Sequence, residues 1–414
     1  MKKICIVIYL LFSALITFGG SMKKTVSVAD IMEKARKGET LSVVFFGGSL
    51  TWGANSSNPN VTSWRGRTMQ MLQKRYPQAH WTFTDAAIGG TGSTLGIFRL
   101  ERDVFRRNPD LVILDFTLND GLQGSREGFH DTANQSYEGI LRACLERNVA
   151  VLPVFFASKG HTENRNIAVL KRRLQHMELF NKYQLEYADV LKLLNDDYKA
   201  GKLNTDELWP PEVFDRVHPH DAGYAAYAAC FNREWERIEN APVKRPILHR
   251  EALCGDTFQY FRRFDLAELN RPGWGPGFSY PVADCFDWLS SRWLDKVVTC
   301  GNAERVSVNK WKSNGNKAEP FQFKFRAEQI ALMMEVIPES VPFSVSIDGE
   351  APRSIKFREV QSSQFHFVTL GSNLDPDKIH TITVYPQQKT ADRPAVMRWG
   401  SILLNSSKPV ELEW

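Results

Sequence analysis

The first part of the chain, from about residue 25 to residue 240, alternates short apolar runs with segments whose apolar residues recur every three or four positions. Runs that are apolar throughout predict strands buried on both faces, and the helical spacing predicts helices packed over them. The expected strands lie at 41–46, 81–87, 111–116 and 150–156, and the expected helices at 28–37, 68–76, 96–107 and 137–147. This alternation predicts a doubly wound α/β domain over residues 22–240, with a parallel sheet covered by helices on both faces.

The pattern changes after Phe231. The stretch "NAPVKRPILHR" at 240–250 carries two prolines and no clear period, so we interpret residues 241–250 as a linker. Short segments of alternating polarity follow at 342–350, 366–372, 380–386 and 396–404. Strands at this spacing without intervening helices predict a C-terminal β-sandwich of jelly-roll type over residues 251–414. Residues 255–280, rich in Phe, Tyr, Pro and Gly, show no clear pattern.

The first 21 residues have the layout of a secretory signal peptide. Two lysines precede an apolar stretch at 4–18, and small residues follow at 19–21. The alternative, an uncleaved anchor, is disfavoured because the apolar stretch is shorter than the ~20 residues of a membrane span. Cys5 lies at the very start of the apolar stretch, whereas a lipid-bearing cysteine would follow it. We therefore expect an exported bacterial protein, periplasmic or extracellular, without stable membrane insertion after processing.

Composition narrows the class of protein further. A length of 414 residues fits two domains, and 43% hydrophobic with 24% charged residues is ordinary for a soluble globular chain. The formal net charge is +5, and two of these charges belong to the predicted signal, so the sequence gives no support for nucleic-acid binding. Five cysteines follow the signal at spacings that match no zinc site. The odd number leaves at least one free thiol, and the three in the last third, Cys254, Cys285 and Cys300, could include one disulfide.

The segment "VVFFGGSLTWG" at 43–53 places Ser49 immediately after a buried strand, on a turn of two glycines. Such a turn presents the serine hydroxyl at the carboxyl end of the sheet, where open α/β sheets bind ligands. The same Gly-Gly-Ser sequence, taken alone, is more typical of a serine that caps a helix. Ser49 is therefore a candidate nucleophile only if the chain supplies the other groups that acyl transfer requires.

The segment "DRVHPHDAGY" at 215–224 supplies a candidate base. Asp215 lies three residues before His218, and Pro219 fixes the chain after the histidine. In a turn, this spacing lets the carboxylate accept a hydrogen bond from one imidazole nitrogen while the other nitrogen points toward a serine. Alone, the pair is also compatible with half of a metal site or with a surface ion pair. With Ser49, it completes a nucleophile, a base and a group that orients the base.

Two further strand ends supply candidate oxyanion donors. "AIGGTGS" at 87–93 contains a glycine cluster whose N–H groups can approach a ligand closely, and "FTLND" at 116–120 ends a buried strand with Asn119. Each segment alone is an ordinary turn. Four such junctions at successive strand ends favour a common site.

Taken together, these segments resemble the SGNH, or GDSL-type, hydrolases. The resemblance covers about residues 40–230 and lies in "GGSLTWG", "IGGTG", "TLND" and "DRVHPHDAGY", which stand in the order of the family's motifs. It implies a flavodoxin-like three-layer fold and a serine esterase that needs no metal or cofactor. It also implies that Ser49 is the nucleophile, His218 the base and Asp215 the group that orients it.

The same resemblance implies an oxyanion hole formed by the N–H of Ser49, the N–H of Gly90 and the side chain of Asn119, with Gly89 as the alternative to Gly90. Two positions depart from the family pattern. Gly48 stands where the family usually has an acidic residue, and His220, which we interpret as a loop residue, stands where asparagine is frequent. The Gly-Gly-Ser variant and the stretches "GGTGSTLGIFRL" and "NPDLVILDF" are similar to a subgroup of bacterial carbohydrate esterases. Asp120 is expected to support the loop of Asn119 by local hydrogen bonds.

The substrate is inferred from weaker signals. Trp52, Trp64 and Arg65 lie near the nucleophile in sequence and are candidates for a sugar subsite, although buried core tryptophans are equally common. No long hydrophobic lid segment is present. We predict removal of acyl groups, acetyl above all, from a polysaccharide or oligosaccharide through an acyl-enzyme.

Two other functions stay open: a lysophospholipase or arylesterase with the same residues, and a glycan-binding protein without catalysis. The C-terminal domain either binds carbohydrate or braces the catalytic domain. The short linker, which contains proline, favours the brace.

Overall fold

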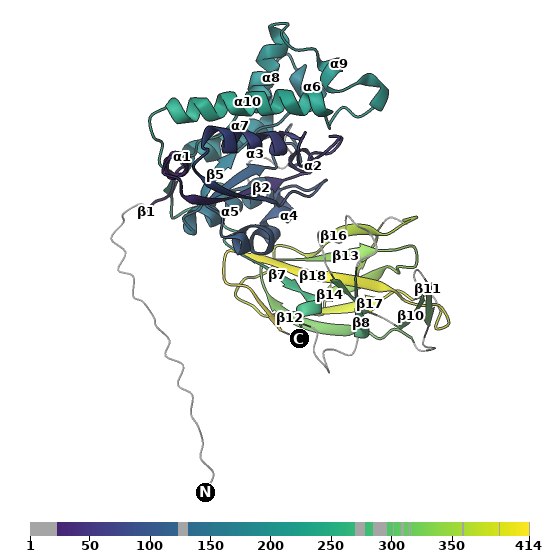
Figure 1. Ribbon diagram of the computed structural model, residues 1–414. Coiled ribbons are helices and arrows are strands. Elements are labelled where there is room, and N and C mark those ends of the chain that lie inside the picture. Colours follow the sequence, from purple (N-terminus) through teal and green to yellow (C-terminus); the bar gives the residue numbers. More distant parts are fainter. Residues whose placement is uncertain are drawn as a thin grey trace.

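The computed structural model describes residues 23–122, 131–269, 278–284, 296–300, 302–307, 310–313, 315, 317–357, 360–388 and 390–413. They form two lobes, an α/β lobe drawn in purple to teal and a β lobe drawn in green to yellow (Figure 1). The predicted signal peptide at 1–21 lies outside the described residues.

The α/β lobe is built on a parallel sheet whose strands lie in the order β3, β2, β4, β5. Their bounds are β3 (His80–Asp85), β2 (Thr40–Gly47), β4 (Leu111–Asp115) and β5 (Ala150–Pro153). A single parallel bridge between Val154 and Ala188 extends the sheet beyond β5. From β2 the chain goes outward to β3 and then returns to the other side of β2 as β4. This reversal opens a crevice at the carboxyl ends of β2 and β4, which is where doubly wound sheets bind ligands.

Helices cover both faces of this sheet, as the sequence predicts (Figure 1). One face carries α1 (Val28–Arg36), α3 (Trp64–Arg75) and α10 (Asp221–Asn240), and α10 contacts both of the others. The other face carries α4 (Ser93–Gly96) and α5 (Thr132–Glu146), which also contact one another. The other helices of this lobe are α2 (Ser49–Trp52), α6 (Lys159–Thr162), α7 (Lys171–Lys182), α8 (Val190–Lys199) and α9 (Thr205–Leu208).

Three helical predictions differ from the structure at their boundaries. The helices α3 and α5 begin several residues earlier than their apolar periodicity indicates, because Ser63 and Asp131 cap their N-termini with side-chain hydrogen bonds. The predicted helix at 96–107 is broken: a 3₁₀ turn (Ile97–Arg99), a π-helical turn (Leu100–Val104) and a second 3₁₀ turn (Phe105–Arg107) follow α4. The break coincides with Arg99, whose buried guanidinium binds the Asp103 carboxylate.

The C-terminal lobe is a sandwich of two antiparallel sheets. One sheet has the order β15, β14, β17, β12, β19, and the other has the order β16, β13, β18, β9, β8, with β7 also paired to β18. Their bounds are β7 (Tyr260–Asp265), β8 (Phe278–Asp284), β9 (Lys296–Cys300), β12 (Phe321–Arg326), β13 (Gln329–Val336), β14 (Phe343–Ile347), β15 (Arg353–Ile355), β16 (Gln364–Gly371), β17 (His380–Pro386), β18 (Met397–Ser406) and β19 (Glu411–Glu413). A hairpin of β10 (Ala303–Ser307) and β11 (Lys310–Ser313) accompanies them. From β12 to β19 the chain passes between the two sheets at almost every step, as in a jelly roll.

The segment predicted as a linker lies on the α/β lobe. Within it, β6 (Ile247–Leu248) pairs with β1 (Lys23–Lys24), and the Arg142 guanidinium donates hydrogen bonds to the carbonyls of His249 and Arg250. The tie continues past residue 250, because the buried Glu138 carboxylate accepts hydrogen bonds from the N–H groups of Leu253 and Cys254, each at 2.6 Å. The chain is therefore fixed to the first lobe before it enters the second.

The two lobes also share apolar contacts. The core cluster of the α/β lobe includes four side chains of the β-sandwich: Val297, Ala331, Met333 and Leu403. All four are buried. The lobes are therefore docked through a continuous core, which supports the interpretation of the sandwich as a brace.

The structure locates part of the cysteine set. Cys144 and Cys230 are buried free thiols, and Cys254 is also buried. Cys285 and the side chain of Cys300 lie outside what the structure describes, so the possible disulfide in the last third stays a prediction.

Replacing Glu138 by alanine leaves the N–H groups of Leu253 and Cys254 buried without an acceptor. The hydroxyl of Tyr183, which also donates to this carboxylate, loses its acceptor as well. We expect the free energy of unfolding to fall by about 2–4 kcal/mol, because three donors that are buried or partly buried are left unsatisfied. Thermal and urea unfolding measure this change. Glu146→Ala, at the exposed end of the same helix, is the control and changes stability by no more than about 0.5 kcal/mol. Equal stability of the two variants would show that the tie contributes nothing.

Candidate active site

The turn after β2 brings Ser49 to the carboxyl edge of the sheet, as the first residue of α2. The two preceding glycines are required by close packing. A Cβ on Gly47 would lie 2.7 Å from the carbonyl oxygen of Asp115, and a Cβ on Gly48 would lie 2.4 Å from the side-chain oxygen of Asn119. The departure at Gly48 therefore has a physical reason, because any side chain there would displace Asn119.

Ser49, His218 and Asp215 form one hydrogen-bonded chain. The Nε2 atom of His218 lies 2.7 Å from Oγ of Ser49, and its Nδ1 atom lies 2.7 Å from Oδ2 of Asp215. The histidine and the aspartate come from the loop between α9 and α10, whereas the serine follows β2. His218 and Asp215 keep 25% and 30% of their side-chain surface exposed. The chain of three groups is thus open to solvent, at the place that the sequence predicts.

The Asp215 carboxylate is held in its charged form. Its Oδ1 atom accepts hydrogen bonds from the backbone N–H groups of Val217 at 2.8 Å and His218 at 3.0 Å. Partial burial alone would raise the pKa of Asp215, but the hydrogen bonds from His218 and Val217 outweigh it and lower the pKa to about 2. A permanent negative charge therefore faces Nδ1 of His218 and fixes that nitrogen as the donor.

The candidate oxyanion donors surround Ser49. The Asn119 side chain lies against Gly48, and Gly89 faces the nucleophile closely enough that a Cβ there would lie 3.6 Å from Cβ of Ser49. Gly90 adopts a left-handed conformation with φ of 73°, so the Gly89–Gly90 peptide turns sharply beside the serine. In the described part of the chain, no hydrogen-bond acceptor is assigned to the N–H of Ser49, Gly89 or Gly90. These N–H groups are available to a ligand.

Asp120 supports these donors, as the sequence predicts. Its Oδ1 atom accepts a hydrogen bond from the N–H of Ser93 at 2.8 Å, which fastens the glycine loop to the Asn119 loop. The Nε–H of Arg172 donates to the carbonyl of Asp120 at 3.1 Å, and the same guanidinium binds the buried Asp131 carboxylate. Burial raises the pKa of Asp120 to about 7. The two loops are therefore held as one unit.

Asn55 is a site residue that the sequence analysis does not identify. Its side-chain amide donates to Oδ2 of Asp215 at 2.9 Å and to the carbonyl of His218 at 3.3 Å. Asn55 has a φ of 67°, a left-handed conformation that asparagine tolerates better than most residues. Farther along the same loop, Ser57 and Thr62 bind the Asp221 carboxylate. The local sequence "TWGANSSN" does not indicate this role, because the residues that Asn55 contacts lie about 160 positions away in the chain.

Thr51 and Asp115 lie beneath the nucleophile. The Thr51 hydroxyl donates to Oδ2 of Asp115 at 2.8 Å, and both side chains are buried. Burial raises the pKa of Asp115 to about 7. The hydrogen bond from Thr51 lowers this pKa, but by less than burial raises it. This contact ties the first turn of α2 to the end of β4.

Of the three residues predicted to line a sugar subsite, the structure leaves only one accessible. Trp52 is half-buried and stays a candidate. Trp64 is fully buried: its ring packs on Phe156 and its Nε1–H donates to the carbonyl of Leu50. Arg65 is 3% exposed and donates to the carbonyl of Thr51 at 3.3 Å. Placing Trp64 and Arg65 in a subsite is therefore a wrong prediction, since both support the nucleophile turn from inside the protein.

His220 is a loop residue at the N-cap of α10, and its N–H donates to the carbonyl of Leu208.

Within the described residues, no helix is long and apolar enough to cross a bilayer. In the same part of the chain, no group of three His, Cys, Asp or Glu side chains is placed to hold a metal ion.

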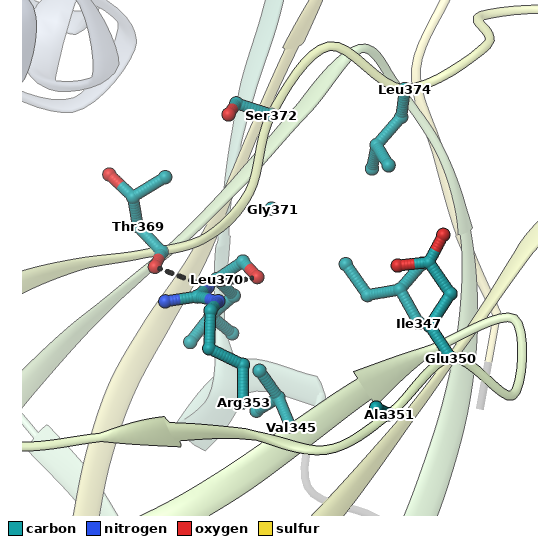
Figure 2. A pocket seen from close by; sticks show the side chains of 10 residues that line it. All are labelled: Val345, Ile347, Glu350, Ala351, Arg353, Thr369, Leu370, Gly371, Ser372 and Leu374. Carbon is teal, nitrogen blue, oxygen red and sulfur yellow. Dashed lines mark hydrogen bonds between the residues drawn. The ribbon is translucent and has the colours of Figure 1, made fainter.

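The β-sandwich carries a separate cavity of about 440 Å³ between the β14–β15 hairpin and the end of β16 (Figure 2). The Arg353 guanidinium that borders it donates to the carbonyls of Thr369 and Leu370. None of the lining residues is aromatic. The cavity therefore offers no ring on which a sugar could stack.

A parallel α/β sheet that gathers a serine, a histidine and a charged carboxylate in one hydrogen-bonded chain at its carboxyl edge has the arrangement of an acyl hydrolase. Residues 45–226 match the profile of the GDSL-like lipase/acylhydrolase family. The α/β lobe is therefore similar to GDSL-like lipases and acylhydrolases over these residues, and the chain is a carboxylic ester hydrolase. A comparison with curated protein sequences gives no match.

Solved structures share the whole architecture. A two-domain esterase (CEX) active on acetylated mannans superposes with a TM-score of 0.66 and 20% identity, over 92% of this chain and 95% of that one. The structure of the same esterase co-crystallised with mannopentaose gives a TM-score of 0.67 and 21% identity, over 92% of this chain and 94% of that one. An acetylxylan esterase, Axe2 from Geobacillus stearothermophilus, covers 47% of this chain and 93% of its own length, with a TM-score of 0.38 and 21% identity. At such identity, the first two structures establish that both lobes and their order are those of a known two-domain fold.

Replacing Asn55 by glycine removes the amide and keeps the left-handed backbone. We expect kcat on a small acetyl ester to fall about tenfold, the effect of losing one hydrogen bond to a charged group, with KM little changed. Asn55→Asp lowers kcat further, because a second carboxylate beside Asp215 opposes its charge. Asn373→Gly, with φ of 57° in the β-sandwich, is the matched control. Equal kcat for Asn55→Gly and wild type would remove Asn55 from the site.

Replacing Asp115 by asparagine tests its raised pKa. The carboxyl pKa is near 3.8 in the unfolded chain and about 7 in the folded one. Its protonated form therefore stabilises the fold below pH 4, and this contribution is lost as the pH rises to 7. We expect the unfolding free energy of the wild type, relative to the variant, to fall by about 1.4 kcal/mol per pH unit between pH 4.5 and 7. Denaturant unfolding across this range measures the slope, and parallel curves would contradict it. Asp377→Asn, at an exposed position, is the control.

Proposed function

We propose that this protein removes acetyl groups from polysaccharides or oligosaccharides through an acyl-enzyme formed on Ser49. The observation that carries the proposal is the chain of two 2.7 Å hydrogen bonds from Ser49 through His218 to Asp215. These distances are those at which a base takes a proton from a nucleophile. The roles assigned by the family resemblance and the geometry agree for all three residues.

In the first half of the reaction, Nε2 of His218 takes the hydroxyl proton of Ser49 as Oγ attacks the ester carbonyl. Asp215 stays ionised and stabilises the imidazolium that forms, because its hydrogen bonds lower its pKa to about 2. The tetrahedral intermediate then collapses. His218 returns the proton to the departing sugar hydroxyl, and the acetyl group remains on Ser49.

In the second half, a water molecule attacks the acetyl-enzyme with His218 again as the base, and acetate leaves as Ser49 regains its proton. In both halves the carbonyl oxygen gains negative charge. We assign its stabilisation to the N–H groups of Ser49 and of Gly90 or Gly89, with the amide of Asn119, because Asn119 lies against Gly48 and Gly89 faces Ser49. Donors of this kind contribute several kcal/mol of transition-state stabilisation. Asp120 and Arg172 hold the loops that carry them.

The substrate class rests on two supporting observations. The two-domain esterase that superposes over nearly the whole chain is described as active on acetylated mannans. The Ser49 site is formed by open loops, with the flanking His218 and Asp215 partly exposed, which suits a polymer that has to reach the nucleophile. In this proposal the sandwich braces the catalytic lobe, and the signal-like first 21 residues favour export from the cytoplasm.

Acetate release from acetylated mannan, xylan and pectin, measured for wild type and Ser49→Ala, tests the function. We expect release by the wild type and a loss of at least about 10³-fold in the variant, because the nucleophile is gone while the binding groups remain. Preference for acyl chains longer than about eight carbons, judged against the small selectivity per methylene, would favour a lipid esterase instead. Glycan binding without hydrolysis by either protein would identify a binding protein.

A further inference from the structure

Phe214 is the most exposed large apolar side chain in the part of the protein that the structure describes, with 92% of its surface accessible. It precedes Asp215 directly, so its backbone lies beside the carboxylate that orients His218. An exposed phenylalanine at the edge of an active site is a candidate contact for substrate, since apolar surface left in water carries a cost that binding recovers.

The backbone holds Phe214 in this position. Its φ of 57° is left-handed, a conformation that bulky residues rarely adopt. The turn is fixed before it by the bond from the N–H of Val213 to the carbonyl of Pro210. After it, the Asp215 carboxylate binds the N–H of Val217. Strain that persists because its surroundings enforce it clusters at functional sites.

The surroundings of the ring suit an uncharged ligand. Val213 and Val217 are 38% and 41% exposed and continue the apolar surface on both sides of Phe214. The charged residues of this segment besides Asp215 are the exposed Glu212, two residues before Phe214, and Arg216, which pairs with the Glu163 carboxylate at 3.2 Å. An aromatic face bordered by aliphatic groups accepts the C–H face of a pyranose ring, whose hydroxyls remain in water at its rim.

The position also determines which sugar it can contact. The backbone at residue 215 is separated from Oγ of Ser49 by the Asp215 carboxylate, the His218 imidazole and the two hydrogen bonds of 2.7 Å that join them. The backbone next to Phe214 is therefore set back from Ser49, and we assign the ring to a sugar unit other than the one whose acetyl group is held at Ser49. A neighbouring sugar unit of the same chain can reach it.

We propose that Phe214 is a stacking platform for a sugar ring next to the one that carries the acetyl group, so that the enzyme selects oligomeric over monomeric substrates. The inference rests on the proposed function and adds a subsite to it. Phe214 contributes to binding of the glycan chain and takes no part in proton transfer.

The test compares kcat/KM on acetylated oligosaccharides of increasing length with kcat/KM on p-nitrophenyl acetate, for wild type and Phe214→Ala. We expect the ratio of the two values to fall about tenfold in the variant once the glycan has three or more units, mainly through KM. Tenfold corresponds to about 1.4 kcal/mol. With an acetylated monosaccharide the ratio stays unchanged, and Phe214→Trp restores the wild-type ratio. Ile379→Ala, an exposed apolar residue of the other lobe, is the control.

Three outcomes overturn the inference. An equal loss on p-nitrophenyl acetate would show that Phe214 acts through Asp215, and an unchanged ratio at every length would show that no stacking occurs. A dimer in sedimentation that Phe214→Ala dissociates would show that a second copy covers the ring. If the wild type cleaves p-nitrophenyl acetate and no acetylated glycan, the proposed function fails together with this inference. Glycan cleavage with an unchanged ratio removes this inference alone.

Discussion

The close approach of the strand ends β2 and β4 is the constraint on which the site depends. No Cβ fits at Gly47 or Gly48, and this lack of space lets the Asn119 loop lie directly against the nucleophile turn. The same approach brings Thr51 within hydrogen-bond distance of Asp115. The nucleophile, one oxyanion donor and a buried carboxyl are thus placed by the geometry of two adjacent parallel strands, and the remaining groups are added by loops.

The fold of the α/β lobe could be predicted from the sequence because its strands are apolar throughout and its helices have one apolar face. That Ser49, His218 and Asp215 come together could be predicted because their local sequences carry the spacing that the proposed chemistry requires. Asn55 could not, since its role depends on a contact between loops about 160 residues apart. The prediction for Trp64 is wrong for a related reason. A tryptophan that is close to Ser49 in sequence can point either toward the substrate or into the core, and the ring of Trp64 packs in the core beneath α2.

The broken helix after the glycine loop shows where local periodicity fails. Its apolar spacing predicts one continuous helix, but the buried Arg99 binds Asp103 and the carbonyl of Ala86, and the backbone adjusts through 3₁₀ and π-helical turns. This segment begins three residues after Gly90, and its first 3₁₀ turn (Ile97–Arg99) contacts β7 of the β-sandwich. The oxyanion loop and the second lobe are therefore connected through a single irregular stretch of chain.

The continuous core between the lobes has an evolutionary consequence. A domain that is exchanged freely between enzymes has its own closed core and a polar outer face. This sandwich has a core of its own, but it also places Val297, Ala331, Met333 and Leu403 in the core of its neighbour, so separation would expose an apolar face on each half. The two lobes have to change together, and substitutions on one side of the junction are tolerated only with compensating substitutions on the other.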